Sequence, residues 1–150
     1  MSDTLRALLA VPGLTFDATV TSVTDGDTIR ATVHLGQLEI AGLTCDVTLG
    51  NPKGMSIRLA GCNAWELSTP AGKAARDNLR TILRPGDAVT LSNVTPYKYG
   101  LEVVADVALG DGSDLVSLLT AGFWVAAWDG TGARPLPPWP RPASQDAATP

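Results

Sequence analysis

Residues 57–83, IRLAGCNAWELSTPAGKAARDNLRTIL, contain the change from β-strand to α-helix that decides the fold class. The segment opens on a short apolar run typical of a strand. Ser68 or Thr69 can cap the helix that follows, and Pro70 fits its first position, where no backbone N–H is needed. Small and apolar residues then recur at helical spacing, and the turn sequence RPGD at 84–87 ends the helix.

Strand patterns precede this segment. Apolar residues alternate with polar ones at 16–20 and again at 29–35, which predicts two strands. Asp25-Gly26 lies between them and marks a hairpin turn. Residues 36–55 are interrupted by several glycines, so we expect an extra β-hairpin or a loop excursion there.

Strands and a second helix follow the segment. Residues 89–91 are strand-like, and residues 101–109 alternate strictly between apolar and other side chains. A second helix is expected to begin near Ser113-Asp114 and to end at Gly122. Residues 123–128 predict a final strand-like piece.

This order of elements predicts a mainly β protein of the α+β class. Three strands, a helix, two or more strands and a helix are typical of a five-stranded Greek-key barrel of the OB type, with about two packed helices. We expect the barrel to cover residues 15–132. Residues 1–14 resemble a short amphipathic arm. Residues 133–150 are expected to be a flexible, proline-rich tail, because few of their side chains could be buried.

Composition limits the classes of function. The 150 residues are 45% hydrophobic and 17% charged, as in a single globular domain. The net charge of −4 does not favour nucleic-acid binding, so any phosphate contact must come from a local group of cations. Two cysteines make no disulfide framework. The chain shows no leader and no run of membrane-spanning length, so we expect a cytoplasmic monomer in a bacterial or phage-infected cell.

Three motifs carry a family resemblance. Asp25-Gly26-Asp27-Thr28 comes first, residues 57–66 come second, and Lys98-Tyr99-Gly100 comes third. In this order they resemble the staphylococcal (micrococcal) nuclease family, in which D-G-D-T, R-L-x-x-x-D-x-P-E and K-Y-G-R segments recur. The resemblance implies an OB-type barrel that hydrolyses phosphodiester bonds of DNA or RNA with the help of calcium.

The resemblance implies a metal site. Asp27 matches a metal-ligand carboxylate, although an aspartate in a turn is the structural alternative. Asn63 stands where the family has a second aspartate, and its amide oxygen could bind calcium without contributing charge, which weakens affinity. Ala64 matches a ligand that acts through its backbone carbonyl. Trp65 replaces a common proline in this loop.

Two residues match catalytic positions. Arg58 matches an arginine that holds the phosphate, and its structural alternative is an ion-paired side chain. Glu66 matches the glutamate that orients or activates the attacking water, and its alternative is a glutamate favoured by the helix dipole.

One family residue is missing. A second arginine should follow Gly100, but the chain continues Leu101-Glu102. Other cations could contact phosphate in its place, and we name Lys73, Arg76 and Lys98, although the first two also fit an ordinary solvated helix face.

Two functions therefore remain open at this point. The first is a calcium-dependent nuclease of reduced activity. The second is a non-catalytic module that binds nucleic acid or protein on the same barrel.

Overall fold

The computed structural model describes residues 11–50, 52–97 and 102–139. In chain order, its helices and strands are β1 (Thr15–Asp25), β2 (Thr28–Ile40), β3 (Leu43–Leu49), β4 (Met55–Leu59), β5 (Cys62–Asn63), α2 (Pro70–Ile82), β6 (Ala88–Pro96), β7 (Glu102–Leu109), α3 (Leu115–Ala121) and β8 (Ala126–Ala127).

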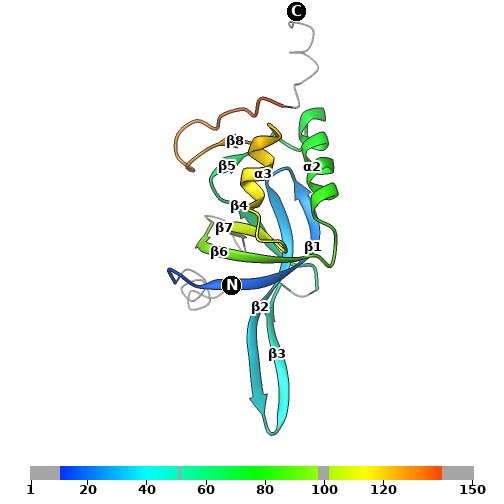
Figure 1. Ribbon diagram of the computed structural model, residues 1–150, viewed down its shortest axis with the longest axis vertical. Helices are drawn as coiled ribbons and strands as arrows, with labels where there is room; N and C mark the ends of the chain where they lie inside the picture. The colour runs from blue at the N-terminus through cyan, green and yellow to red at the C-terminus, as the bar shows by residue number, and fades with distance from the viewer. Residues whose placement is uncertain (1–10, 51, 98–101, 140–150) are drawn as a thin grey trace, which may run out of the picture.

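Five of the strands close into the predicted OB-type barrel (Figure 1). The strand order is β1-β6-β7-β4-β2, and pairing between β1 and β2 closes the circle. All of these pairs are antiparallel except β4 with β7, which is parallel. Register shifts in β1 and β6 mark β-bulges, which help short strands to curve into a barrel.

The barrel interior is filled by the alternating apolar side chains. Val103, Ala105 and Val107 are buried, which confirms the predicted inward face of β7. Leu101 lies outside the described residues. The largest fully buried side chains come from both strands and helices: Ile29, Ile57, Leu59, Leu79, Leu91, Leu115 and Leu119.

Both helices begin where the sequence predicts. The hydroxyl of Thr69 caps α2 by accepting a hydrogen bond from Gly72 N, and Pro70 is the first helical residue. Asp114 caps α3 in the same way through Ser117 N, and Gly122 ends that helix. In Figure 1 the two helices lie at the same end of the barrel as β5 and β8.

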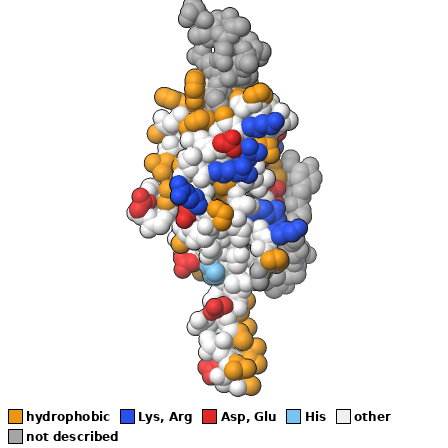
Figure 2. Space-filling view, turned by 90° about the vertical axis from the view of Figure 1, so that its right-hand side faces the viewer, with side chains coloured by type: hydrophobic (Ala, Val, Ile, Leu, Met, Phe, Trp, Pro, Cys, Tyr) orange, Lys and Arg blue, Asp and Glu red, His pale blue; other side chains and the backbone are white. Residues whose placement is uncertain are grey.

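The expected excursion is a long hairpin that projects from the barrel (Figure 1). We call residues 36–47 the distal hairpin. Its strands are joined by the two-residue turn Ala41-Gly42, whose φ angles of 51° and 81° are those of a type I′ turn. Leu38, Ile40 and Leu43 share one face and are 54%, 60% and 69% exposed. Figure 2 shows hydrophobic side chains along one side of this hairpin.

Two expectations need correction. Within residues 123–128, only Ala126–Ala127 forms a strand, which pairs with β5. Residues 133–139 are not a free tail, since they contact the segment after α3 and the strand β5: Pro137 is buried, Trp139 N donates a 2.9 Å hydrogen bond to Phe123 O, and Pro135 O accepts one from Asn63 Nδ2. Most of the arm and residues 140–150 lie outside the described part of the chain. Within the described part, no helix is long and apolar enough to cross a membrane.

Candidate functional site

The turn between β1 and β2 fixes the first site residue. Asp25 pairs with Thr28 across the turn, which leaves Gly26 and Asp27 as its two central residues. A Cβ atom at Gly26 would come within 2.9 Å of Ala64 and 2.8 Å of Ala75. Glycine therefore lets the turn pack closely against α2 and against Ala64, which directly follows β5.

Asp27 is buried, and both of its carboxylate oxygens have partners. Oδ2 accepts hydrogen bonds from Arg58 Nη2 at 3.1 Å and from Ala64 N at 2.9 Å. Oδ1 accepts one from the Thr28 hydroxyl at 3.0 Å. A buried carboxylate is costly without such partners. Ala64 thus meets Asp27 through its N–H group, whereas the sequence predicted a role for its carbonyl.

Arg58 occupies the centre of the site. It extends from β4, and its Nη2 also lies 3.4 Å from Asn63 Oδ1. The guanidinium carbon lies 5.8 Å from the centroid of the Tyr97 ring and 5.9 Å from that of Trp128. Both distances suit a cation–π contact. The ion pair with Asp27 agrees with the structural alternative for Arg58, but a paired arginine can still face a ligand.

Asp25 adds a second carboxylate. Its Oδ1 accepts a hydrogen bond from Asp27 N at 3.1 Å. Burial and the neighbouring charge of Asp27 raise the pKa of Asp25 to about 6, because both effects disfavour a second negative charge. Two close carboxylates of this kind are a natural environment for a proton or a cation.

Glu66 is placed by the start of α2. Its carbonyl oxygen accepts hydrogen bonds from Thr69 N at 3.0 Å and from the Thr69 hydroxyl at 2.7 Å. A Cβ atom at Gly72 would collide with the same carbonyl, so glycine is needed for this approach. The Glu66 carboxylate is exposed and lies 3.5 Å from Arg134 Nη1. Glu66 therefore lies at the entry to α2, as its structural alternative requires, while its carboxylate contacts Arg134.

These residues line one small pocket, which we call the carboxylate pocket. Its volume is about 40 Å³, enough for an ion or a water molecule but not for a nucleotide. Its lining consists of Asp25, Asp27, Arg58, Asn63, Ala64, Trp65, Glu66 and Arg134. The indole N–H of Trp65 is buried and has no hydrogen-bond partner among the described residues.

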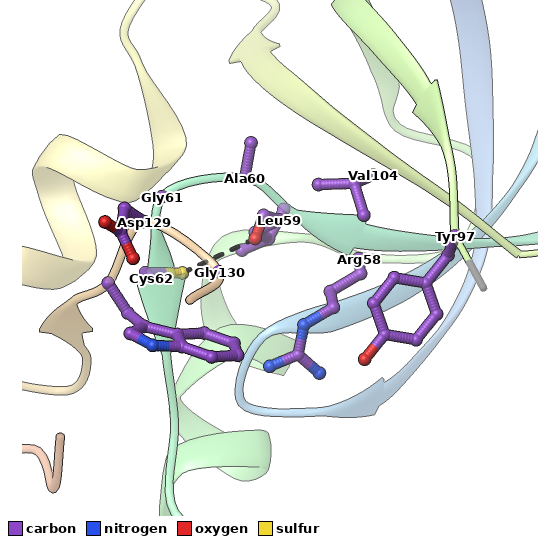
Figure 3. A pocket seen from close by; sticks show the side chains of 10 residues that line it. Arg58, Leu59, Ala60, Gly61, Cys62, Tyr97, Val104, Asp129 and Gly130 are labelled. Atoms are coloured by element: carbon purple, nitrogen blue, oxygen red, sulfur yellow. Dashed lines mark hydrogen bonds between the residues drawn. The ribbon is translucent and has the colours of Figure 1, made fainter. Parts of the chain in front are cut away.

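A larger neighbour, the aromatic pocket, shares Arg58 with the carboxylate pocket. Its volume is about 340 Å³, within the range of small-molecule sites. Figure 3 shows the Arg58 side chain beside the ring of Tyr97, with Leu59, Cys62 and Asp129 on the other walls. Trp128 also lines this pocket. Hydrogen bonds from Thr131 hold the pKa of Asp129 below its usual range, so this rim carries a negative charge.

The oxygen donors of the carboxylate pocket fit a hard cation in type. Asp25 and Asp27 offer carboxylates and Asn63 an amide oxygen, which are the ligands that calcium prefers. However, within the described residues no group of three or more His, Cys, Asp and Glu side chains is arranged to hold a metal. The pocket therefore offers oxygen donors of the right type without the arrangement of a metal centre.

The structure brings five predicted site residues together and leaves two of the described ones apart. Asp27, Arg58, Asn63, Ala64 and Glu66 all line the carboxylate pocket. Lys73 and Arg76 do not line it, and Arg76 pairs with Asp77 at 3.0 Å on the exposed face of α2. Figure 2 shows Lys and Arg side chains mixed with acidic ones on the side of the molecule where α2 lies. Lys98 lies outside the described residues.

Four residues of the site that the argument uses were not predicted: Asp25, Tyr97, Trp128 and Arg134. Asp25 belongs to the Asp25-Gly26-Asp27-Thr28 motif. Its position two residues before Asp27 could have identified it as a site residue. Arg134 is the only Lys or Arg between Lys98 and Arg141, which could have identified it. It was missed because the proline-rich sequence around it predicted a flexible tail. Tyr97 and Trp128 had no distinguishing pattern.

Comparison with known proteins does not assign a family. No model of a known protein family matches the chain, and a search of curated proteins gives no match either.

Proposed function

We propose that this barrel is a phosphodiesterase that hydrolyses DNA or RNA weakly with the help of calcium. The observation that carries this proposal is the carboxylate pocket, where Asp27, Arg58, Asn63 and Glu66 converge from the β1–β2 turn, β4, β5 and the entry to α2. They are the residues that the resemblance to staphylococcal nuclease identified from the sequence. An acidic pair, a guanidinium and a carboxylate open to solvent suit attack of water on a phosphodiester.

Each residue has a distinct role in this proposal. The guanidinium of Arg58 binds a phosphoryl oxygen, and Asp27 fixes its orientation through the 3.1 Å ion pair. The Glu66 carboxylate accepts a proton from water as the water oxygen bonds to phosphorus. The bond from phosphorus to one ester oxygen breaks, and that oxygen takes a proton from solvent.

Calcium would be held by Asp27 and Asn63, with Asp25 beside them. When bound, it would supply positive charge near the phosphoryl group. Because Asn63 is neutral, we expect its affinity to be low.

The aromatic pocket would accommodate the nucleoside next to the reacting phosphate. Its two rings, Tyr97 and Trp128, offer surfaces for a base, and Arg58 connects the two pockets.

A second function, a non-catalytic binding module, is favoured by the pairing within the site. Arg58 is already matched by Asp27, and Glu66 faces Arg134. A site whose charges satisfy one another can bind a ligand without performing chemistry.

Cleavage of single-stranded DNA with and without calcium separates the two functions. We expect slow, calcium-dependent cleavage that is lost in Glu66→Gln, a variant of the same size without a base. Arg84→Gln, which changes an exposed arginine beyond the far end of α2, should cleave like the wild type. If the wild type binds calcium and DNA but never cleaves, the binding module is the better proposal. If Glu66→Gln cleaves as well as the wild type, the role of Glu66 as the base is wrong.

A further inference from the structure

Arg134 places a second guanidinium at the carboxylate pocket. Its Nη1 lies 3.5 Å from Glu66 Oε1, and its guanidinium carbon lies 5.3 Å from the centroid of the Trp128 ring. Arg58 lies 5.9 Å from the centroid of the same ring. Two guanidinium groups, those of Arg58 and Arg134, therefore lie beside the Trp128 ring. The Arg58 side chain is 12% exposed and the Arg134 side chain is 42% exposed, so Arg134 is the more accessible to solvent.

Hydrogen bonds on both sides of Arg134 hold its segment in place. Trp128 Nε1 donates to Thr131 O at 2.8 Å, and Asn63 Nδ2 donates to Pro135 O at 3.0 Å. Proline at 135 also restricts the backbone next to Arg134. The second of these bonds ties the segment directly to a residue of the carboxylate pocket.

The charges of the site leave Arg134 available for an anion. Arg58 is matched by Asp27 at 3.1 Å in a partly buried pair. The contact between Arg134 and Glu66 is longer, and both side chains are exposed, so it adds little stability and can exchange. Phosphodiester hydrolysis builds negative charge on the phosphoryl oxygens, and cations placed around them lower the barrier.

We propose that Arg134 is a phosphate-binding residue that exchanges Glu66 for a phosphoryl oxygen when substrate binds. This inference rests on the proposed function. The exchange does two things at once: it adds a second cation beside the phosphate, and it frees the Glu66 carboxylate to take the proton from water. Arg134 thereby supplies the positive charge that the Leu101-Glu102 sequence does not.

Arg134 suits this role better than the other described cations. Arg76 donates from Nε to Asp77 at 3.0 Å and does not line the pocket. Lys73 does not line it either. Among the residues that the structure describes, Arg58 and Arg134 are the only two cations in the lining of the carboxylate pocket.

The test uses the full chain with Arg134→Ala, Arg134→Lys and the control Arg84→Ala. Two quantities are measured for each: kcat and KM for single-stranded DNA with calcium, and the Kd of thymidine 3′,5′-bisphosphate by calorimetry. For Arg134→Ala we expect kcat to fall by about 10²-fold or more, because a transition-state contact is lost. The Kd of the bisphosphate should rise about tenfold. Arg134→Lys should recover part of the kcat and part of the affinity for the bisphosphate. Lysine keeps the positive charge but lacks the paired N–H donors of the guanidinium.

The outcomes separate this inference from the proposed function. If the wild type cleaves DNA and Arg134→Ala cleaves and binds bisphosphate equally well, the role of Arg134 is wrong and the nuclease stands. If Arg134→Ala cleaves faster than the wild type, the phosphate-binding role of Arg134 is also wrong, because Arg134 would then merely block Glu66. If the wild type never cleaves but binds bisphosphate through Arg134, phosphate binding stands and hydrolysis fails. If the wild type neither cleaves nor binds bisphosphate, both fail.

Discussion

The carboxylate pocket and the distal hairpin depart in opposite ways from the usual distribution of side chains, in which proteins bury apolar side chains and expose polar ones. The pocket buries polar groups: Asp27 and Asn63 are each 4% exposed. The hairpin exposes apolar groups, of which Leu43 is 69% exposed. Leaving a polar group unpaired inside a protein costs more than leaving an aliphatic side chain in water. Asp27 and Asn63 accordingly have hydrogen-bond partners, whereas the described residues provide no cover for the apolar face of the hairpin.

The two cysteines offer the sharpest measure of this difference. Cys62 is buried beside the pocket, and Cys45 is exposed on the distal hairpin. Burial, followed by the charge of Asp27, raises the pKa of Cys62 from 9.0 to about 12. Thiolate is the reactive form, so its amount falls about 10³-fold at neutral pH, and burial slows the reaction further. With a thiol reagent, Cys45 should be labelled at once and Cys62 only on unfolding.

Mass spectrometry of labelled peptides would check this contrast. Cys45→Ser should remove the fast labelling, and Cys62→Ser should leave it unchanged. Rapid labelling of both thiols in the folded protein would mean that the barrel end near the pocket opens easily.

The next largest effect should come from the Asp27–Arg58 pair. Arg58→Met keeps a long side chain but leaves the buried Asp27 carboxylate without its cation. We expect the free energy of unfolding to fall by about 3 kcal/mol, measured by urea denaturation. Adding Asp27→Asn should restore part of the loss, because no buried charge is then left unpaired.

Arg76→Met is the matched control for that variant. Its partner Asp77 has a 61% exposed side chain, so the loss should stay below about 1 kcal/mol. Equal losses for the two arginines would show that Arg58 contributes through ordinary packing and not through the buried charge.

Local patterns predicted the barrel well and the site only in part. Alternation in 101–109 and the cap at Thr69 depend on neighbouring residues, so both could be found from the sequence. The contact between Asn63 and Pro135 joins residues 72 positions apart, and no local pattern encodes it. Proline-rich sequence at 133–139 predicted flexibility, yet restricted backbones also cost less entropy to order, which favours the packing of this segment against β5 and the end of α3.

That packing predicts a moderate effect of truncation. A chain that ends at Gly132 loses the acceptor for Asn63 Nδ2, the bond from Trp139 N to Phe123 O, and the packing of Pro137. We expect the free energy of unfolding to fall by about 1–2 kcal/mol, since each such hydrogen bond contributes about 1 kcal/mol. A chain that ends at Trp139 keeps all three contacts and serves as the control. No loss in the shorter chain would restore the expectation of a free tail from residue 133.

The smallest effect should come from the distal hairpin. Replacing Leu38, Ile40 and Leu43 together by threonine keeps the preference for strand and removes most of the exposed apolar surface. Since these side chains are mostly in water already, each change should alter the free energy of unfolding by no more than about 0.5 kcal/mol. Val33→Thr is the matched control, because Val33 lies on the same strand but is 1% exposed inside the barrel. It should cost about 1–3 kcal/mol by burying a hydroxyl. A triple variant that loses more than Val33→Thr would mean that the apolar face is covered in the folded protein in solution.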